Sequence, residues 1–308
     1  MTSRKHHDDS RKNTLIAIGL TCIAYGYFNI GDAALKMLAG KFHFSQIIVT
    51  NCLIIIACMV TSGWIREGRK AFVMHNPKGI LLRACLSCAV GILNILAIPH
   101  IQLTTFYTLV FTSPFWVALL ATVFLKEKLD PHRAAVIMAG FATIAFVFHP
   151  GSALFNIWAV LILIGAFFYS CSLIVMRRLG PKESRTMIIT MGSLVSTIVA
   201  LPFLPFHFIW PTPYEWGLFV LMGTLGSISV TCIAYAYQNA PSAAVVAPYH
   251  YTQMIWGTLL GYYLFNEIPD DRIVLGAALI IAAGLYLLVT EARRKPKIVE
   301  VPESAAVS

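Results

Sequence analysis

Charged residues are scarce in this chain, and their scarcity argues against a soluble protein. Only 12% of the 308 residues are charged, whereas 58% are hydrophobic and the mean hydropathy is +0.74. Soluble globular domains carry about 25% charged residues. The longest polar segment between apolar runs covers residues 65–78 and is too short to fold by itself. We therefore expect a membrane protein without a soluble domain.

Motifs for catalysis and nucleotide binding are also missing. The sequence has no phosphate-binding glycine loop, metalloprotease helix or nucleophile elbow. Asp32 is the single acidic residue inside the predicted spans, which leaves no pair of acids for chemistry within a membrane. We expect neither an enzyme nor a bound cofactor. Two rival interpretations stay open, an intramembrane redox protein or enzyme and a sensor subunit that transports nothing.

Cysteine is not used for disulfides or metal binding in this interpretation. All seven cysteines fall inside apolar runs, and Cys85 and Cys88 form a CxxC pair within one of them. Inside a membrane helix, such small residues are typical of helix packing. The polar start MTSRKHHDDSRKN leads into an apolar run too long for a cleaved signal peptide.

Ten apolar runs are long enough to cross a membrane. A spanning helix needs about 20 mostly apolar residues, and an unpaired backbone is too costly in lipid for any other open structure. We therefore predict an all-α bundle of ten transmembrane helices between tails at residues 1–13 and 291–308. The predicted spans are residues 14–37, 44–64, 79–99, 104–125, 133–148, 154–176, 187–206, 216–237, 243–265 and 273–290.

The basic residues predict the orientation of these spans. With the N-terminus inside, 20 of the 23 Lys and Arg residues lie in inner segments, and only Lys36, Lys41 and Arg272 lie outside. This bias is typical of cytoplasmic loops. We expect an inner-membrane protein with both termini in the cytoplasm. The formal charge of +9 then reflects topology and a lipid bilayer as partner, with no nucleic acid.

Two spans carry features that favour a transport pathway. On the first, Asn29, Asp32 and Lys36 share one helix face, near Tyr25. One interpretation is an interfacial pair with Lys36 reaching outward, and the other is a titratable Asp32 that couples transport to protons. On the fourth, Pro114 removes the hydrogen bond to Val110, which predicts a kink; Pro248 has the same effect on the ninth span.

Internal similarity indicates that one five-helix unit occurs twice, at residues 14–150 and 154–290. A shift of 141 residues lays Lys36-Met37-Leu38 over Arg177-Arg178-Leu179. Because five is odd, the two units cross the membrane in opposite directions, which is typical of secondary transporters with a site between the halves. A shift of 140 residues matches Thr112 with Thr252, Ser113 with Gln253, Trp116 with Trp256, Glu127 with Glu267 and Asp130 with Asp270.

These segments resemble the drug/metabolite transporter superfamily, in particular its EamA-type members. The resemblance rests on two segments of the sequence. They are FTSPFWVALLATVFLKEKL with Gly140 and His149-Pro150, and AYQNAPSAAVVAPYHYTQMIWGTLLGYYLFNEIPD with Gly276 and Gly284. The resemblance implies a ten-helix carrier that moves a small metabolite by alternating access. It implies a central cavity lined by the first, third, fourth, sixth, eighth and ninth spans. Where an arginine is common on the second span of such proteins, this chain has Asn51.

The substrate is not specified by the resemblance. Proteins with similar ninth spans include carriers of S-adenosylmethionine, riboflavin or amino acids. An aromatic-rich pocket would suit a planar or amphipathic compound. The resemblance leaves both monomer and homodimer open.

The ninth span provides the main candidate site. Tyr249, Gln253 and Trp256 recur on one helix face, and the repeat places Ser113 and Trp116 at the matching positions. The alternative is that the tryptophans face lipid and the amide is bonded to another helix. His250 is a second candidate for proton coupling, although a packing histidine is the alternative. Further cavity candidates are Tyr25, Asn29, Asn94, Tyr169 and Tyr235.

Residues at the span ends are interpreted as structural. Glu127 and Glu267 each precede a turn and would bond backbone donors there. Gly257 and Gly261 form a GxxxG motif for close helix approach. The outer-side histidines could gather into a cluster, but we expect solvated side chains and no metal site. They are His43, His100, His149 and His207.

Overall fold

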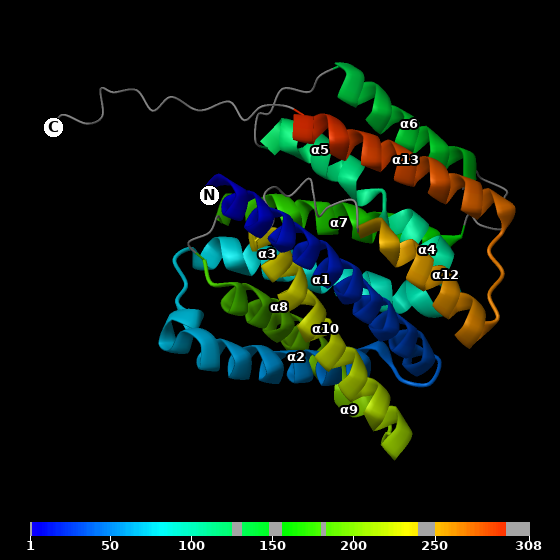
Figure 1. The fold of residues 1–308 in the computed structure, drawn as a ribbon. Coiled ribbons are helices and arrows are strands. Elements are labelled where there is room, and N and C mark those ends of the chain that lie inside the picture. Colours follow the sequence, from blue (N-terminus) through cyan, green and yellow to red (C-terminus); the bar gives the residue numbers. More distant parts are fainter. Residues whose placement is uncertain (1, 125–130, 148–155, 180–182, 240–249, 294–308) are drawn as a thin grey trace.

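All the regular structure in the described residues is helical (Figure 1). A computed structural model describes residues 2–124, 131–147, 156–179, 183–239 and 250–293. Within these ranges each predicted span lies over helix, as expected. The α-helices are α1 (Thr2–Ala39), α2 (Phe44–Glu67), α3 (Pro77–Ala97), α4 (Leu103–Val110), α5 (Ser113–Phe124), α6 (Pro131–Val147), α7 (Ile157–Leu179), α8 (Arg185–Ala200), α9 (Leu204–His207), α10 (Pro213–Asn239), α12 (Thr252–Phe265) and α13 (Asp271–Arg293).

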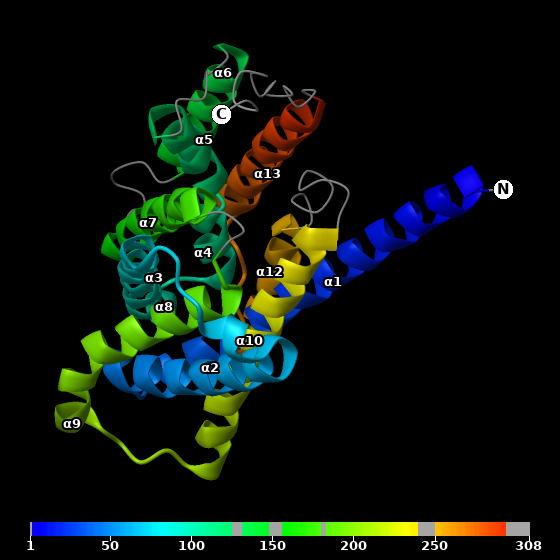
Figure 2. The same ribbon diagram turned by 90° about the vertical axis from the view of Figure 1, so that its left-hand side faces the viewer.

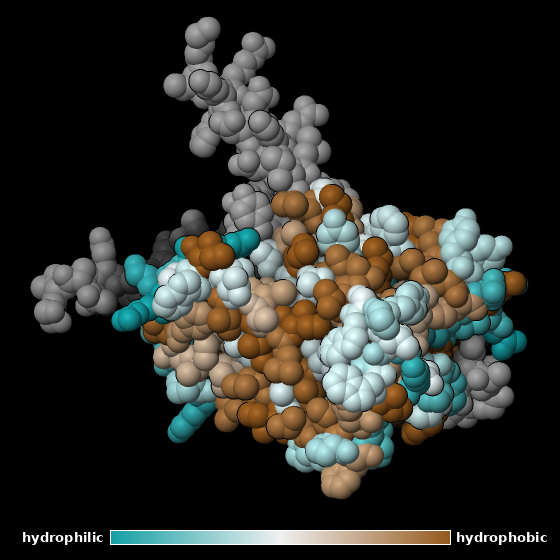
Figure 3. Space-filling model, turned by 90° about the horizontal axis from the view of Figure 1, so that it is seen from below, coloured by the Kyte–Doolittle hydropathy of each residue, from teal (hydrophilic) through white to brown (hydrophobic). Residues whose placement is uncertain are grey.

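Helix length and surface both fit a multi-pass membrane protein. Six helical stretches among the described residues are long and apolar enough to span a membrane. Hydrophobic residues occupy much of the face seen in Figure 3. Many large apolar side chains are exposed, and Phe146 of α6, for example, is 68% exposed. The six stretches are Phe44–Phe72, Pro77–His100, Leu103–Phe124, Ile157–Met176, Arg185–His207 and Pro213–Ile233.

The fourth predicted span is broken into two helices at the place that Pro114 predicts. Helix α4 ends at Val110 and α5 begins at Ser113. Between them Phe111 N–H donates to the Tyr107 carbonyl at 2.9 Å, and Thr112 N–H donates to the Leu109 carbonyl at 3.1 Å. Pro114 has no N–H group to donate to the Val110 carbonyl, so the helical hydrogen bonds are interrupted there and the helix restarts at Ser113. Pro248 lies outside the described residues.

The helices pair in a pattern that brings the two parts of the chain together. Helix α1 packs along α10 and also against α12. Helix α7 packs along α3 and against α5, while α2 lies against α8 and α6 against α13 (Figures 1 and 2). The N-terminal part of α1 projects beyond the other helices in Figure 2. Most large interfaces therefore join one helix from residues 2–147 to one from residues 157–293.

The core is centred on α4 and the start of α5. Tyr107, Phe111 and Phe115 are almost completely buried there. Helix α12 approaches α4 closely at Gly257, since a Cβ atom at that position would overlap the Tyr107 ring. The predicted role of the GxxxG motif in close helix approach is thus confirmed at Gly257. This packing fixes the Tyr107 side chain, which points toward α1.

Candidate functional site

The polar face of α1 lies at the centre of the site. Asn29 is completely buried and its Nδ2 donates to the Tyr25 carbonyl at 2.8 Å. Asp32 lies less than one turn further along the same face. The Tyr107 hydroxyl, from α4, donates to Asp32 Oδ2 at 2.6 Å. This contact joins α1 to α4 through a carboxylate within the bundle.

Asp32 borders a cavity of about 210 Å³ between α1, α2, α3, α8 and α10. Asn51 from α2, Ser193 from α8 and Ser227 from α10 supply its other polar side chains. Apolar side chains form the rest of the wall. The lining residues are Phe28, Gly31, Asp32, Leu35, Asn51, Ile55, Ile95, Ile189, Ser193, Met222, Gly226, Ser227 and Val230.

Some polar groups of the cavity have hydrogen-bond partners within the protein, and others have none. Asn51 Oδ1 is enclosed and has no hydrogen-bond partner among the described residues. The Ser227 hydroxyl is already engaged, because it donates to the Gly223 carbonyl at 2.8 Å. Among the described residues no Lys, Arg or His lines the cavity, and of these residues Asp32 is the one ionisable group that faces it. Buried polar atoms without partners are uncommon and often mark ligand positions.

An aromatic stack extends the site toward α12. The His250 ring lies parallel to the Tyr25 ring, with centroids 4.6 Å apart and planes at 2°. The Phe111 ring contacts the His250 ring edge-on, with the two ring centroids 5.5 Å apart. Gln253 is buried and its side chain is a hydrogen-bond partner of His250. Tyr25 and Asn29, with Asp32 on the same face of α1, were all predicted from the sequence, as were His250, which stacks on Tyr25, and Gln253, which bonds to His250.

Tyr107 and Phe111 belong to this candidate site, although nothing in the sequence marked them. Both lie where α4 ends, and they connect the aromatic stack to Asp32. The nearest signal was the kink predicted at Pro114, which marks the fourth span as irregular. The sequence did not identify Tyr107 as the partner of Asp32, because the two residues are 75 positions apart.

The two predicted tryptophans lie away from the cavity. Trp256 is 42% exposed and packs against Gly26 of α1, where a Cβ atom would lie 3.3 Å from the indole. Trp116 contacts Phe141 and Phe167 edge-on, at 4.6 and 5.2 Å. Neither residue borders the 210 Å³ space. Their contribution to substrate binding stays a prediction.

The remaining candidates are dispersed over the bundle. Ser113 is buried, and its carbonyl accepts a hydrogen bond of 3.1 Å from the Ser170 hydroxyl. Asn94 Oδ1 lies close to Gly165 on α7. Tyr169 is on the outer face of α7 and is 37% exposed, and Tyr235 lies on α10. Tyr249 lies outside the described residues.

Comparison with known proteins identifies the family. Residues 156–290 match the EamA-like transporter family. The riboflavin transporter of Rhizobium johnstonii is 30% identical over 236 residues, which cover 75% of this chain and 77% of that protein. The chain belongs to the EamA-like transporter family. It is therefore a multi-pass membrane transporter of the drug/metabolite transporter superfamily and not an enzyme.

Other relatives of this EamA-like chain align over nearly its whole length. The S-adenosylmethionine uptake transporter of Rickettsia bellii is 23% identical over 94% of this chain and 99% of its own. A pseudopaline exporter of Pseudomonas aeruginosa is 25% identical over 87% of this chain and 94% of its own. A crystal structure aligns with 92% of this chain and 99% of its own, with a TM-score of 0.62 at 13% identity, which shows a shared fold.

One end of the EamA-like bundle is closed by an ion pair. Lys36 at the end of α1 bonds to Glu267, and it also donates to the Ile101 carbonyl at 2.5 Å. Glu267 Oε2 accepts a hydrogen bond of 2.9 Å from Leu103 N–H, at the first turn of α4. The predicted structural role of Glu267 is confirmed. The predicted interfacial pair of Asp32 with an outward-reaching Lys36 is wrong, since Asp32 bonds to Tyr107 whereas Lys36 bonds to Glu267 and the Ile101 carbonyl. Glu127 lies outside the described residues.

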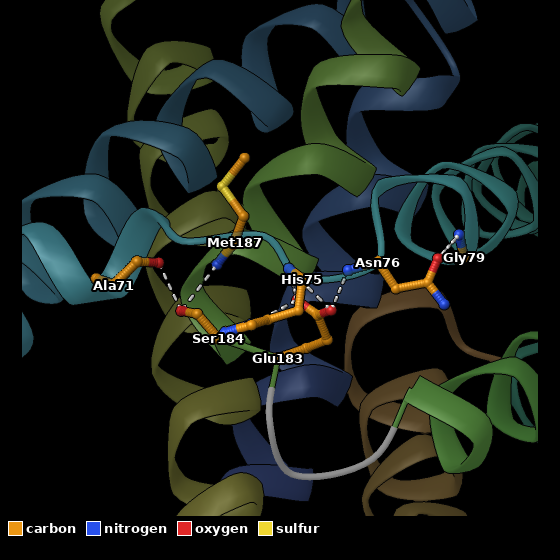
Figure 4. Close-up of polar contacts among 7 residues, drawn as sticks. All are labelled: Ala71, His75, Asn76, Gly79, Glu183, Ser184 and Met187. Carbon is orange, nitrogen blue, oxygen red and sulfur yellow. Dashed lines mark hydrogen bonds and ion pairs between the residues drawn. The ribbon is translucent and has the colours of Figure 1, made fainter.

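A buried carboxylate lies at the start of α8 and bonds to the connection between α2 and α3 (Figure 4). Glu183, before α8, accepts hydrogen bonds from the N–H groups of His75 and Asn76 at 3.1 and 2.5 Å. Its neighbour Ser184 donates to the Ala71 carbonyl at 2.5 Å. These bonds attach the connection between α2 and α3 to the start of α8. Glu183 lies in a short polar connection between two predicted spans, where nothing in the sequence distinguishes it from a solvated side chain.

Among the described residues, the outer-side histidines do not gather into one cluster. His43 and His207 stack with centroids 4.0 Å apart, while His100 stacks separately on Trp158. Burial and the neighbouring His207 lower the pKa of His43 below its usual value. His149 lies outside the described residues. Within the described ranges no group of three metal-ligating side chains occurs, and the cysteines are free thiols.

Proposed function

We propose that this protein is a secondary transporter that moves a small organic metabolite across the inner membrane by alternating access. The observation that carries the proposal is the cavity at Asp32. It lies between α1, α2 and α3 of the first half and α8 and α10 of the second. A small shift between the halves would open such a space to either side.

The proposal includes two inverted five-helix units, residues 14–150 and 154–290, with ten membrane spans. Support comes from pairings that persist when the units are exchanged: α1 with α10 corresponds to α7 with α3, and α1 with α12 to α7 with α5. Helix caps support it too. Asn76 Oδ1 accepts from Gly79 N–H before α3, and Thr212 Oγ1 accepts from Glu215 N–H before α10. In both, proline follows the capping residue.

The substrate class rests on the cavity and on the relatives. Ligand pockets usually measure about 300–1,000 Å³, so a 210 Å³ cavity must widen for a molecule of riboflavin size. We propose a planar or amphipathic metabolite, comparable to S-adenosylmethionine, riboflavin or an amino acid. Asp32 and His250 are the proposed coupling groups for protons. Proposed wall residues in the widened state are Tyr25, Asn29, Asn94, Ser113, Trp116, Tyr169, Tyr235, Tyr249, Gln253 and Trp256.

The orientation completes the proposal. Both terminal tails, residues 1–13 and 291–308, are cytoplasmic, on the basis of the basic residues in the corresponding connections. The chain acts as a monomer or homodimer.

Transport is tested with the purified full chain in liposomes. Radiolabelled riboflavin, S-adenosylmethionine and a mixture of amino acids are offered with and without a pH gradient. We expect accumulation or exchange of one of them above the level of empty liposomes. A sensor subunit would bind a solute without moving it. Absence of accumulation and exchange for every solute and gradient contradicts transport.

A further inference from the structure

We infer that the Asp32 cavity selects small organic cations, in particular amphipathic amines that place an ammonium group beside the Asp32 carboxylate. The inference rests on the proposed function in one respect, because it assumes that this cavity is where the substrate binds. It adds the charge of the substrate, which neither the family nor the names of the relatives determine.

The first step is the charge balance around Asp32. The Tyr107 hydroxyl is its partner, and this group is neutral. The nearest cation on its own helix, Lys36, lies four residues on and is bonded to Glu267 and the Ile101 carbonyl. None of the side chains that line the cavity is cationic. A carboxylate within a membrane protein is costly unless a positive charge or a proton compensates it.

The second step concerns the hydrogen-bonding groups nearby. Asn51 Oδ1, on the cavity wall, has no donor, and Asn29 Oδ1, just before Asp32 on α1, has none either. The hydroxyl hydrogens of Tyr107 and Ser227 are already given to Asp32 and to the Gly223 carbonyl. Beside the Asp32 carboxylate, the wall therefore presents at least one acceptor, Asn51 Oδ1, that no donor of the described residues satisfies. An ammonium group provides up to three donors and no acceptor.

The third step is the apolar part of the wall. Phe28, Leu35, Ile95 and Met222 face the same space as Asp32. They can pack against a hydrocarbon or aromatic group attached to the cation. An anion of the same shape would meet the carboxylate without a compensating cation, and a neutral compound would leave the carboxylate unpaired. Asp32 is thus a specificity-determining residue for charge.

The test compares three probes with one skeleton: phenethylamine, 2-phenylethanol and 3-phenylpropionate. They carry an ammonium, a hydroxyl and a carboxylate. Dissociation constants are measured calorimetrically on the purified full chain in detergent. We expect the amine to bind at least about thirtyfold more tightly than the alcohol, the ratio expected for a buried charge pair. The anion should bind more weakly than either.

Variants assign this preference to Asp32. In Asp32→Asn the advantage of the amine should disappear, and in Asp32→Glu it should persist. Asp271→Asn removes an exposed carboxylate at the start of α13 and serves as the matched control, with unchanged binding expected. Size-exclusion profiles check that each variant folds, and Asp32→Glu keeps the test informative where Asp32→Asn does not fold. Equal binding of the three probes, absent amine binding, or an unchanged preference in Asp32→Asn overturns the inference.

The outcome is separable from that of the transport assay. If the liposomes move a solute with which phenethylamine does not compete, transport stands and the cation inference falls. If phenethylamine binds through Asp32 but no solute is moved, the cation inference stands and transport falls.

Discussion

At the scale of single residues, the hydrogen bond between Tyr107 and Asp32 determines the character of the site. It joins a side chain that is 2% exposed to the carboxylate beside the cavity. Hydrogen bonds to charged groups contribute about 1.5–3 kcal/mol to stability, roughly twice the value of neutral ones. This bond therefore both supports the core and holds one carboxylate oxygen, so that the second is available to a ligand.

Removing the Tyr107 hydroxyl tests that coupling. Tyr107→Phe keeps the ring that fills the space beside Gly257 but leaves Asp32 without its donor. We expect the free energy of unfolding in detergent to fall by about 1.5–3 kcal/mol. In an Asp32→Asn background the same change should cost clearly less, because the charged acceptor is gone. Tyr263→Phe, at a 75% exposed position, is the control. Equal losses in both backgrounds would contradict the coupling.

Sequence spacing predicted part of this site correctly, for a physical reason. Residues on one helix face are fixed by the 3.6-residue period, so Tyr25, Asn29 and Asp32 were expected together. Contacts between helices do not follow from that period. The bond of Asp32 to Tyr107 and the bond of Lys36 to Glu267 depend on how α1, α4 and α12 pack. This is why the sequence paired Asp32 with the wrong side chain.

At the scale of elements, composition and proline predicted the helices, but not how their ends are attached. The break between α4 and α5 follows from Pro114 alone. The attachment of the α2–α3 connection to Glu183 does not follow from either segment, because the two are more than 100 residues apart. Backbone N–H groups at helix starts need acceptors, yet many side chains can supply them.

Glu183 should be necessary for this attachment. Glu183→Ala leaves the N–H groups of His75 and Asn76 without their acceptor, in a region where the carboxylate is buried. We expect the free energy of unfolding to fall by about 1–3 kcal/mol. Hydrogen exchange should become faster at these two amides. Glu67→Ala, which removes an exposed carboxylate from α2, should leave both quantities unchanged. Unaltered exchange at His75 and Asn76 in Glu183→Ala would show that other contacts hold the connection.

At the scale of the whole molecule, side-chain hydrogen bonds hold the connections between helices together at two ends of the bundle. Gln46 of α2 exchanges two hydrogen bonds with the backbone of Ile209, at 2.7 and 3.0 Å. The α1–α2 turn and the connection before α10 therefore share one end. Glu183 brings the α2–α3 connection and the start of α8 to another end. The basic residues predict that the end with Gln46 faces outward and the end with Glu183 inward.

Single cysteines can test this arrangement in intact cells. Gly40→Cys and Trp210→Cys introduce thiols at exposed positions of the first end, and Arg69→Cys and Lys78→Cys at exposed positions of the second. A membrane-impermeant maleimide added outside should label the first pair. The second pair should react only after the membrane is opened, because helix α2, which is long and apolar enough to span a bilayer, lies between the two pairs. The unaltered chain, whose seven cysteines are free thiols, gives the background.

The pattern of labelling separates two conclusions. If the second pair reacts from outside and the first does not, the two ends lie on opposite sides of the membrane as predicted. The orientation inferred from the basic residues is then wrong. If all four positions react from outside, the two connections share a side, and the inverted arrangement of the halves fails. Labelling of the first pair alone supports both, and it places the Lys36–Glu267 ion pair at the outer end of the pathway that leads to Asp32.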